Sequence, residues 1–395
     1  MSSEQPLRVI QMIPDLRVGG AERVAITLAN GLAERGHKVM LLAVKGGGPQ
    51  ELHLRKDLGL DFRILGIQRA SIKNPLKFLK SMKALRSSIC DILEEFQPDV
   101  INTHIPEDDL VASSCVKRTG IGVHVPVVQS LMFHIHRKGL DFRTRIRLKM
   151  MGKMFHQAKV TLAVSSGVAK QITKLTGLPA DRMEVLHNVT DIQAYANPPS
   201  KEVACAKLGL DPNRPVITGV GRLHPQKNFP MFVRASKAIL EKHPDAQFMI
   251  IGEGDERGKV EAVIEEAGVG NSWTLLGQRN DVPECLAAAD LFVQPSDYEG
   301  FSVALVEAMA AGLQIVATDV ASLGEVVQDG IHAMLIPAGE QEELSNSIIE
   351  MLDNPEKALA LSAAAKDLAW SYYNIEAYIK RAEVFLRAAV ASSHA

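Results

Sequence analysis

Short apolar runs alternate with amphipathic stretches along most of the chain. Leu7–Ile13 has the pattern of a buried strand, residues 14–20 form a loop that ends in glycine, and Ala21–Arg35 has the spacing of a helix. The same order recurs further on. More strands are predicted at Lys38–Val44, Val100–Thr103, Val125–Gln129 and Val160–Val164. Strands that alternate with helices predict a parallel sheet covered on both faces.

A second series of this kind follows a change in composition. Residues 191–215 are rich in Pro, Asn and Asp, as expected at a domain boundary. The later strands are predicted at Val216–Val220, Gln247–Ile251, Trp273–Leu276, Leu291–Gln294 and Gln314–Ala317, and a helical segment at Leu344–Val390 with a bend near residues 370–374. The series therefore predicts an α/β protein with two doubly wound, Rossmann-like domains facing an interdomain cleft, with ligands outside the carboxyl ends of the strands.

The chain length supports this division. A chain of 395 residues is long for one core and suggests two domains. We expect the first domain at residues 1–190, the second at residues 191–370, and a helical segment at residues 371–395.

One carboxylate interrupts an otherwise apolar helix. Every residue of Val303–Ala311 except Glu307 is Val, Ala, Leu or Met, which predicts a helix buried on all sides. The neighbours of Glu307 three and four positions away are apolar, so its own helix offers no cation. Two explanations remain open: a residue from another element satisfies the carboxylate, or a polar ligand donates hydrogen bonds to it.

Two cations follow the first strand of the second series. Gly219 and Gly221 would let a ligand approach the backbone closely, and Arg222 and Lys227 then offer charges suited to a diphosphate. Two solvated surface charges are the alternative. The dinucleotide-binding fingerprint is excluded because His224 stands near the place of its third glycine.

The start of the apolar helix adds an anion site. Gly300, Phe301 and Ser302 would present backbone N–H groups there, and Glu299 lies directly before them. Glu307, one to two turns further, lies at a depth suited to a ribose. Cations, helix-start amides and two carboxylates together indicate a site for a nucleotide linked to a sugar.

Composition and charge narrow the function classes. With 46% hydrophobic and 23% charged residues, and no apolar run of about 18 residues, the chain is expected to be soluble and cytoplasmic. Its net charge of -2 hides an asymmetry, because residues 1–190 carry +11 and residues 191–395 carry -13. A basic half suits an anionic membrane or a phosphate-bearing substrate. No nucleic-acid-binding motif accompanies it, so no nucleic-acid partner is expected.

Neither metal nor cofactor chemistry is indicated. The four cysteines, Cys90, Cys115, Cys205 and Cys285, form no Cys-x-x-Cys pair and are expected to be buried thiols.

Glu299 and Glu307, with seven residues between them, resemble the EX7E motif of retaining GT-B glycosyltransferases, in particular those of family 4. Other matching segments follow in the same order: Gly19-Gly20, Asp99–His104, Val164–Ser166, His187-Asn188, Gly221-Arg222 with Lys227, Ile251–Gly254, Gly277, Asp290 and Glu325. The resemblance implies a retaining, metal-independent transfer of a sugar from a nucleotide diphosphate sugar, with uridine favoured, to a glycan, glycolipid or lipid-linked acceptor.

The resemblance implies that residues 1–190 bind the acceptor, that residues 191–370 bind the nucleotide sugar, and that residues 371–395 pack back towards the first domain. It also implies roles for individual residues. Arg222 and Lys227 would neutralise the leaving diphosphate, Glu299 would contact the donor hexose, and Glu307 would bind the ribose. Gly19 and Gly20, with Gly221 and Gly254, would allow close backbone approach to the donor or acceptor.

A histidine near the donor sugar is less well defined. Met132 stands where the family pattern places this histidine, and His134 is the assigned substitute. A loop histidine in solvent and His104 remain alternatives.

A basic segment at residues 134–159 carries eight Lys or Arg among apolar side chains. It would suit peripheral association with an anionic membrane; a packed helix with a solvated basic face is the alternative. Two other functions also remain open. A non-hydrolysing nucleotide-sugar epimerase has a related fold, and a non-catalytic protein could bind a nucleotide sugar without turnover.

Overall fold

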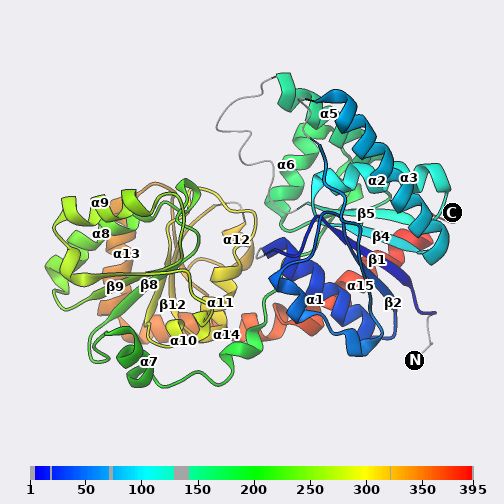
Figure 1. Ribbon diagram of the computed structural model, residues 1–395. Coiled ribbons are helices and arrows are strands. Elements are labelled where there is room, and N and C mark those ends of the chain that lie inside the picture. Colours follow the sequence, from blue (N-terminus) through cyan, green and yellow to red (C-terminus); the bar gives the residue numbers. More distant parts are fainter. Residues whose placement is uncertain (1–4, 18–19, 71–73, 129–141, 321, 394–395) are drawn as a thin grey trace. The chain divides into compact units, whose positions relative to one another are not determined.

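The computed structural model describes residues 5–17, 20–70, 74–128, 142–320 and 322–393 of the chain (Figure 1). The chain forms two compact units, Met1–Asn188 with Ile375–Ala395, and Val189–Asn374. The chain thus leaves the first unit, builds the second, and returns to the first for its last helix.

The first unit contains a parallel sheet. Within the described residues it has seven strands in the order β3-β2-β1-β4-β5-β6-β7. These strands are β1 (Arg8–Ile13), β2 (Lys38–Ala43), β3 (Asp61–Ile64), β4 (Val100–Thr103), β5 (Val123–Val128), β6 (Thr161–Ala163) and β7 (Met183–Val185). The α-helices are α1 (Gly20–Glu34), α2 (Pro75–Phe96), α3 (Pro106–Thr119), α5 (Phe142–Gln157), α6 (Ser166–Thr176) and α15 (Ile375–Ala391).

The second unit repeats this architecture. Its described strands form a parallel sheet in the order β10-β9-β8-β11-β12-β13. They are β8 (Val216–Val220), β9 (Gln247–Ile251), β10 (Trp273–Gly277), β11 (Leu291–Gln294), β12 (Gln314–Thr318) and β13 (Met334–Ile336). The α-helices are α7 (Lys201–Leu208), α8 (Phe229–Lys242), α9 (Arg257–Ala267), α10 (Val282–Leu286), α11 (Val303–Ala311), α12 (Leu323–Val326), α13 (Gln341–Asp353) and α14 (Pro355–Tyr372).

The predicted α/β class with two doubly wound parallel sheets is confirmed. Strands β4, β8, β9 and β11 have the predicted bounds, and the helix predicted at Ala21–Arg35 spans Gly20–Glu34. Strands β3, β7 and β13 are short and lie at sheet edges, and the sequence did not predict them. Edge strands need no continuous apolar run, because one side meets solvent. The predicted C-terminal helical segment breaks twice, at Asn354-Pro355 and near Asn374, rather than once.

The buried side chains agree with two further expectations. All four cysteines are buried and carry free thiols. Among the described helices, none is both long and apolar enough to cross a bilayer.

Helix α15 anchors the end of the chain on α1. A Cβ atom added at Gly31 in α1 would lie 2.4 Å from Cγ1 of Ile379, so glycine allows the two helices their close contact. Nearby, Glu383 accepts a hydrogen bond from Arg35 at 2.6 Å and another from Arg387 at 2.9 Å. Burial raises the pKa of Glu383, but these hydrogen bonds outweigh it and the net pKa is lowered.

The Gly31 contact gives a stability prediction. Gly31→Ala should lower the free energy of unfolding by about 1–3 kcal/mol, because the buried, branched side chain of Ile379 must shift. Thermal unfolding should show this as a Tm lower by about 2–4 °C per kcal/mol.

Gly258 in α9 provides the control. A Cβ there meets nothing within 4 Å, so Gly258→Ala should be neutral or stabilising by up to about 1 kcal/mol. Equal Tm values for wild type and Gly31→Ala would contradict the packing argument.

Candidate functional site

The loops after β8 and β9 pack backbone against backbone at the carboxyl edge of the second sheet. A Cβ added at Gly252 would lie 1.9 Å from the carbonyl oxygen of Gly221, and one at Gly254 would lie 2.4 Å from that of Leu223. Leu223 N–H donates to the carbonyl of Glu253 at 3.0 Å. Gly221 itself has a φ of 154°, which disfavours any other residue. The predicted site glycines therefore first serve to bring two loops together.

Lys227 and Glu299 meet at this edge. Lys227 Nζ donates to Glu299 Oε1 at 2.6 Å, and the Glu299 side chain is 4% exposed. The same carboxylate accepts hydrogen bonds from Gln226 Nε2 (3.1 Å, to Oε2), Gln294 Nε2 (3.0 Å) and Ser296 Oγ (2.7 Å). A buried carboxylate needs such partners, because an unpaired charge is costly away from water.

The start of α11 is tied into this network. Ser302 Oγ accepts from Leu305 N–H at 3.2 Å, which caps the helix, and donates to Gln294 Oε1 at 2.7 Å. Gln294 then links the helix start to Glu299. Ser302 is buried, so its hydroxyl serves the protein, while first-turn N–H groups of the helix have no partner within the helix itself.

Arg222 and Lys227 differ in their surroundings. Lys227 is held by Glu299 and is mostly covered. The Arg222 side chain is exposed, and within the described part of the chain it makes no ion pair or hydrogen bond. One cation is thus fixed in position and the other is available to solvent or to an anion.

Glu307 lies on a partly exposed face of α11. The helix has the predicted bounds, but the expectation of burial on all sides is wrong: Val303, Ala304, Glu307 and Ala311 form a half-buried stripe. Residues spaced four apart share one helix face, so a single open face accounts for all of them. Thr190 Oγ1 donates to Glu307 Oε1 at 3.0 Å. A residue from another element therefore contributes to satisfying this carboxylate.

Phe301 and Gly300 complete the loop before α11. The Phe301 ring lies 6.0 Å from the Tyr373 ring, centroid to centroid, so this side chain takes part in packing within the unit. Gly300 lies directly after the buried carboxylate of Glu299.

The predicted residues of the first unit are only partly described. Gly20 is the first residue of α1, and open space surrounds its Cβ position. Gly19 and His134 lie outside the described residues. The alternative histidine, His104, is buried at the end of β4 and its Nε2–H donates to Gln11 Oε1 at 2.8 Å. Burial lowers the pKa of His104 to about 4, so its ring is neutral at neutral pH.

Sequence reasoning missed Gln226, Gln294 and Ser296, which hold the Glu299 carboxylate. Gln294 gave one signal, since it is the polar end of the apolar strand Leu291–Gln294. Nothing in the sequence marks Gln226 or Ser296, because their importance depends on the meeting of two loops, one after β8 and one after β11.

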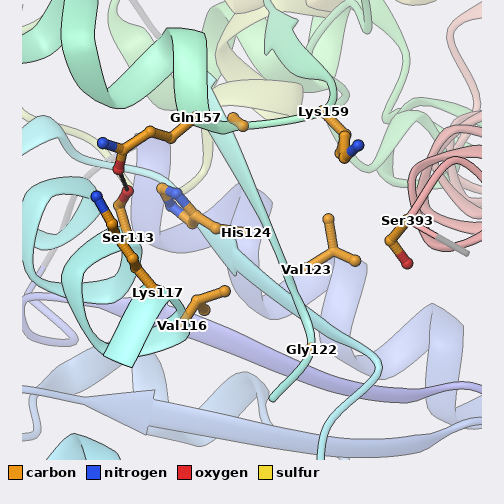
Figure 2. A pocket seen from close by; sticks show the side chains of 10 residues that line it. Ser113, Val116, Lys117, Gly122, Val123, His124, Gln157, Lys159 and Ser393 are labelled. Atoms are coloured by element: carbon orange, nitrogen blue, oxygen red, sulfur yellow. Dashed lines mark hydrogen bonds between the residues drawn. The ribbon is translucent and has the colours of Figure 1, made fainter. Parts of the chain in front are cut away.

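A pocket of about 340 Å³ lies elsewhere, in the first unit (Figure 2). It is lined by Ser113, Val116, Lys117, Gly122, Val123, His124, Gln157, Ala158, Lys159 and Ser393. His124 Nε2 lies 2.8 Å from Thr103 Oγ1, and burial lowers its pKa to about 3. The lining includes none of the predicted site residues. Gly122 and Val123 place the pocket at the amino-terminal end of β5, whereas ligands of such sheets bind at the carboxyl ends.

Metal ligands are not grouped in the described ranges: no three His, Cys, Asp or Glu side chains there are placed to hold a metal ion together.

Comparison with curated proteins finds glycosyltransferases. The UDP-Gal:alpha-D-GlcNAc-diphosphoundecaprenol alpha-1,3-galactosyltransferase of Escherichia coli is 28% identical over 287 residues, which cover 71% of this chain and 72% of that protein. Sulfoquinovosyl transferase SQD2 of Arabidopsis thaliana is 22% identical over 85% of this chain and 64% of its own length. The D-inositol 3-phosphate glycosyltransferase of Nocardia farcinica is 29% identical, and the match spans about half of each chain.

Solved structures share the fold over nearly the full length. Anabaena Alr3699/HepE, solved in complex with UDP, superposes with a TM-score of 0.80 at 20% identity, covering 97% of this chain and 100% of that one. Sucrose-phosphate synthase from Thermosynechococcus elongatus gives 0.79 at 19% identity, covering 98% and 100%. The predicted GT-B fold is thereby confirmed.

Two family models account for most of the sequence. Residues 18–194 match the model described as Glycosyltransferase Family 4, and residues 200–368 match the model described as Glycosyl transferases group 1. Together they leave only short segments of the chain unmatched, and the chain therefore belongs to the group 1 glycosyltransferases of family 4.

Proposed function

We propose that this protein transfers a sugar from a nucleotide diphosphate sugar to a glycan or lipid-linked acceptor, with retention of anomeric configuration and without a metal ion. The observation that carries the proposal is the Lys227–Glu299 pair, 2.6 Å apart at the carboxyl edge of the second sheet, with exposed Arg222 in the same loop as Lys227.

The two cations suit the charge that the reaction creates. When the bond between the sugar and the diphosphate breaks, negative charge develops on the leaving group, and positive groups already in place lower the barrier. The Lys227 ammonium has three N–H donors and gives one to Glu299, which leaves others for a phosphate oxygen. Arg222 can bind a second phosphate oxygen pair with its planar fork.

Glu299 has two roles in this proposal. It orients the ammonium of Lys227 through Oε1, which also accepts from Gln294 and Ser296. Its Oε2 accepts from Gln226, and a carboxylate oxygen can accept a further hydrogen bond. That capacity supports contact with a hydroxyl of the donor hexose.

The start of α11 and Glu307 would bind the rest of the donor. N–H groups of the first helical turn, next to Gly300 and Phe301, favour a phosphate. Glu307, half-buried one turn further along the helix, would accept hydrogen bonds from the ribose hydroxyls. Gly20, in the first unit, would leave space for a substrate beside the backbone.

Relatives support uridine as the base and a lipid-linked acceptor. The Anabaena protein was solved with UDP and with UDP-glucose, and the name of the E. coli enzyme gives a UDP-sugar donor and a diphosphoundecaprenol acceptor. Other relatives are named for different acceptors, so we infer the acceptor class from the E. coli enzyme, which matches over most of both chains.

The proposed reaction is tested by incubating the protein with UDP-sugars and a GlcNAc-diphospholipid. We expect acceptor-dependent release of UDP that EDTA leaves unchanged, and a product whose anomeric configuration by NMR equals that of the donor. A donor sugar epimerised without acceptor would instead identify an epimerase. UDP binding without turnover on any acceptor would indicate a binding protein.

The cations are tested by Lys227→Ala and Arg222→Ala. Each should lower kcat on the order of a hundredfold or more, because a stabiliser of transition-state charge is lost. Arg222 is exposed, so its variant should fold normally even if loss of Lys227 destabilises Glu299. Lys357→Ala is a matched control, since Lys357 of α14 pairs with Glu350 of α13 at 2.7 Å and belongs to none of the predicted site residues. Near-normal kinetics in both site variants would reject their assigned role.

Glu307→Ala should weaken UDP binding and leave the fold intact. Calorimetric titration with UDP measures the first effect and thermal unfolding the second. Thr190→Val removes the hydroxyl that donates to Glu307 and serves as a control for this structural hydrogen bond. If Glu307→Ala lowers Tm sharply while UDP binds with unchanged affinity, the carboxylate has only a structural role.

A further inference from the structure

The first turns of α2 are largely exposed to solvent, and of their side chains Met82 is half-buried against the core. From Asn74 to Ala84 no side chain is buried, and burial begins at Leu85. Leu76 is 82% exposed and Leu79 is 63% exposed, which places them among the most exposed large apolar side chains described. Two leucines on an exposed helix end need an explanation, because exposed apolar side chains gathered in one place often mark an interaction site.

The charges of α2 are unevenly distributed along it. Lys77, Lys80 and Lys83 lie in the first half, no acidic residue occurs between 74 and 90, and the acids Asp91, Glu94 and Glu95 lie near the end. This order opposes the helix dipole, which favours acids at the start and cations at the end. The distribution therefore does not serve the stability of the helix.

Helix α5 has a similar outer face. Ile146 is 46% exposed and Met150 is 50% exposed, and exposed Arg145, Lys149 and Lys153 lie beside them. The helix contains no acidic residue. Leu148, Met151, Met154 and Phe155 of this helix are buried, so the predicted basic segment is in part a packed helix.

Both helices begin at the same edge of the first sheet. α2 leads from β3 to β4 and α5 leads from β5 to β6, and all of these strands are parallel. A helix that connects parallel strands starts at their carboxyl ends, which is the edge where ligands of such sheets bind. Figure 1 shows α2, α3 and α5 gathered on the first unit, and α3 packs against both of the others.

We propose that the exposed start of α2, here called the basic leucine surface and formed by Leu76, Lys77, Leu79, Lys80 and Lys83, docks on an anionic lipid bilayer. The leucines enter the boundary between headgroups and acyl chains, and the lysines contact anionic headgroups. Docking at this edge brings the first unit to a lipid-linked acceptor. This purpose rests on the proposed function, whereas the docking itself does not.

Charge and shape favour a bilayer over other occupants. Leucines at the exposed start of a helix gain nothing from a nucleic-acid backbone, and among the described residues beside them no aromatic side chain is exposed for base stacking. A flat anionic surface meets the interleaved apolar and cationic side chains at once. Phe78, half-buried on the same turns, adds apolar area beside the leucines, whereas Met82 packs against the core of the unit.

The proposal is tested by sedimentation of the full chain with lipid vesicles. We expect binding to vesicles of phosphatidylglycerol and phosphatidylcholine, weakened by salt, and little binding to phosphatidylcholine alone. The variant Leu76→Ser with Leu79→Ser should bind about tenfold or more weakly. The variant Lys77→Gln with Lys80→Gln and Lys83→Gln should bind on the order of a hundredfold more weakly at low salt.

Helix α14 supplies a matched control. Leu359→Ser with Lys357→Gln removes a leucine that is 70% exposed and a neighbouring lysine, and should leave vesicle binding unchanged. Each variant is checked for an unchanged Tm and for a normal Tm increase with UDP. Wild-type binding by both α2 variants, equal binding to neutral vesicles, or no vesicle binding at all would overturn the proposal. If UDP still raises the Tm in that case, the proposed transferase function is unaffected.

Discussion

In the second unit, a buried carboxylate holds together the loops at the carboxyl edge of the sheet. Glu299 sits at the end of a short loop with almost no access to water, and a carboxylate in such a place is stable only with a full set of donors. Two loops and one strand end supply them through Lys227, Gln226, Ser296 and Gln294. Because these donors come from the segments after β8 and β11, the carboxylate fixes how the loops at this sheet edge meet.

The same constraint explains what the sequence could and could not predict. Strands such as Leu291–Gln294 and the helix Val303–Ala311 were predictable, because continuous apolar runs bounded by glycine or polar residues have few other structures open to them. The pairing of Lys227 with Glu299 was not, although both were predicted site residues, because 72 positions separate them. Gln226 and Ser296 gave no local signal at all.

Close approach of a ligand to Gly221 and Gly254 stays a prediction, and the structure adds a close approach of the protein's own backbone. At Gly252 and Gly254 the neighbour is the backbone of the 221–223 segment. This contact within the second unit leaves no room for a side chain at either position. Burial of the α11 helix was overestimated for a related reason. Apolar composition on all sides does not reveal that one stripe, with Glu307, stays partly open and meets Thr190.

The charge order along α2 has a consequence for evolution and engineering. Exchanging Lys77, in the first turn, for an acid would suit the helix dipole and should raise the free energy of unfolding. A redesign guided by stability alone would therefore tend to replace Lys77 first, and thermal unfolding would not show any loss of membrane binding. If evolution keeps this unfavourable charge order, the chain has a lower thermal stability than it could have and retains its binding to the bilayer in exchange.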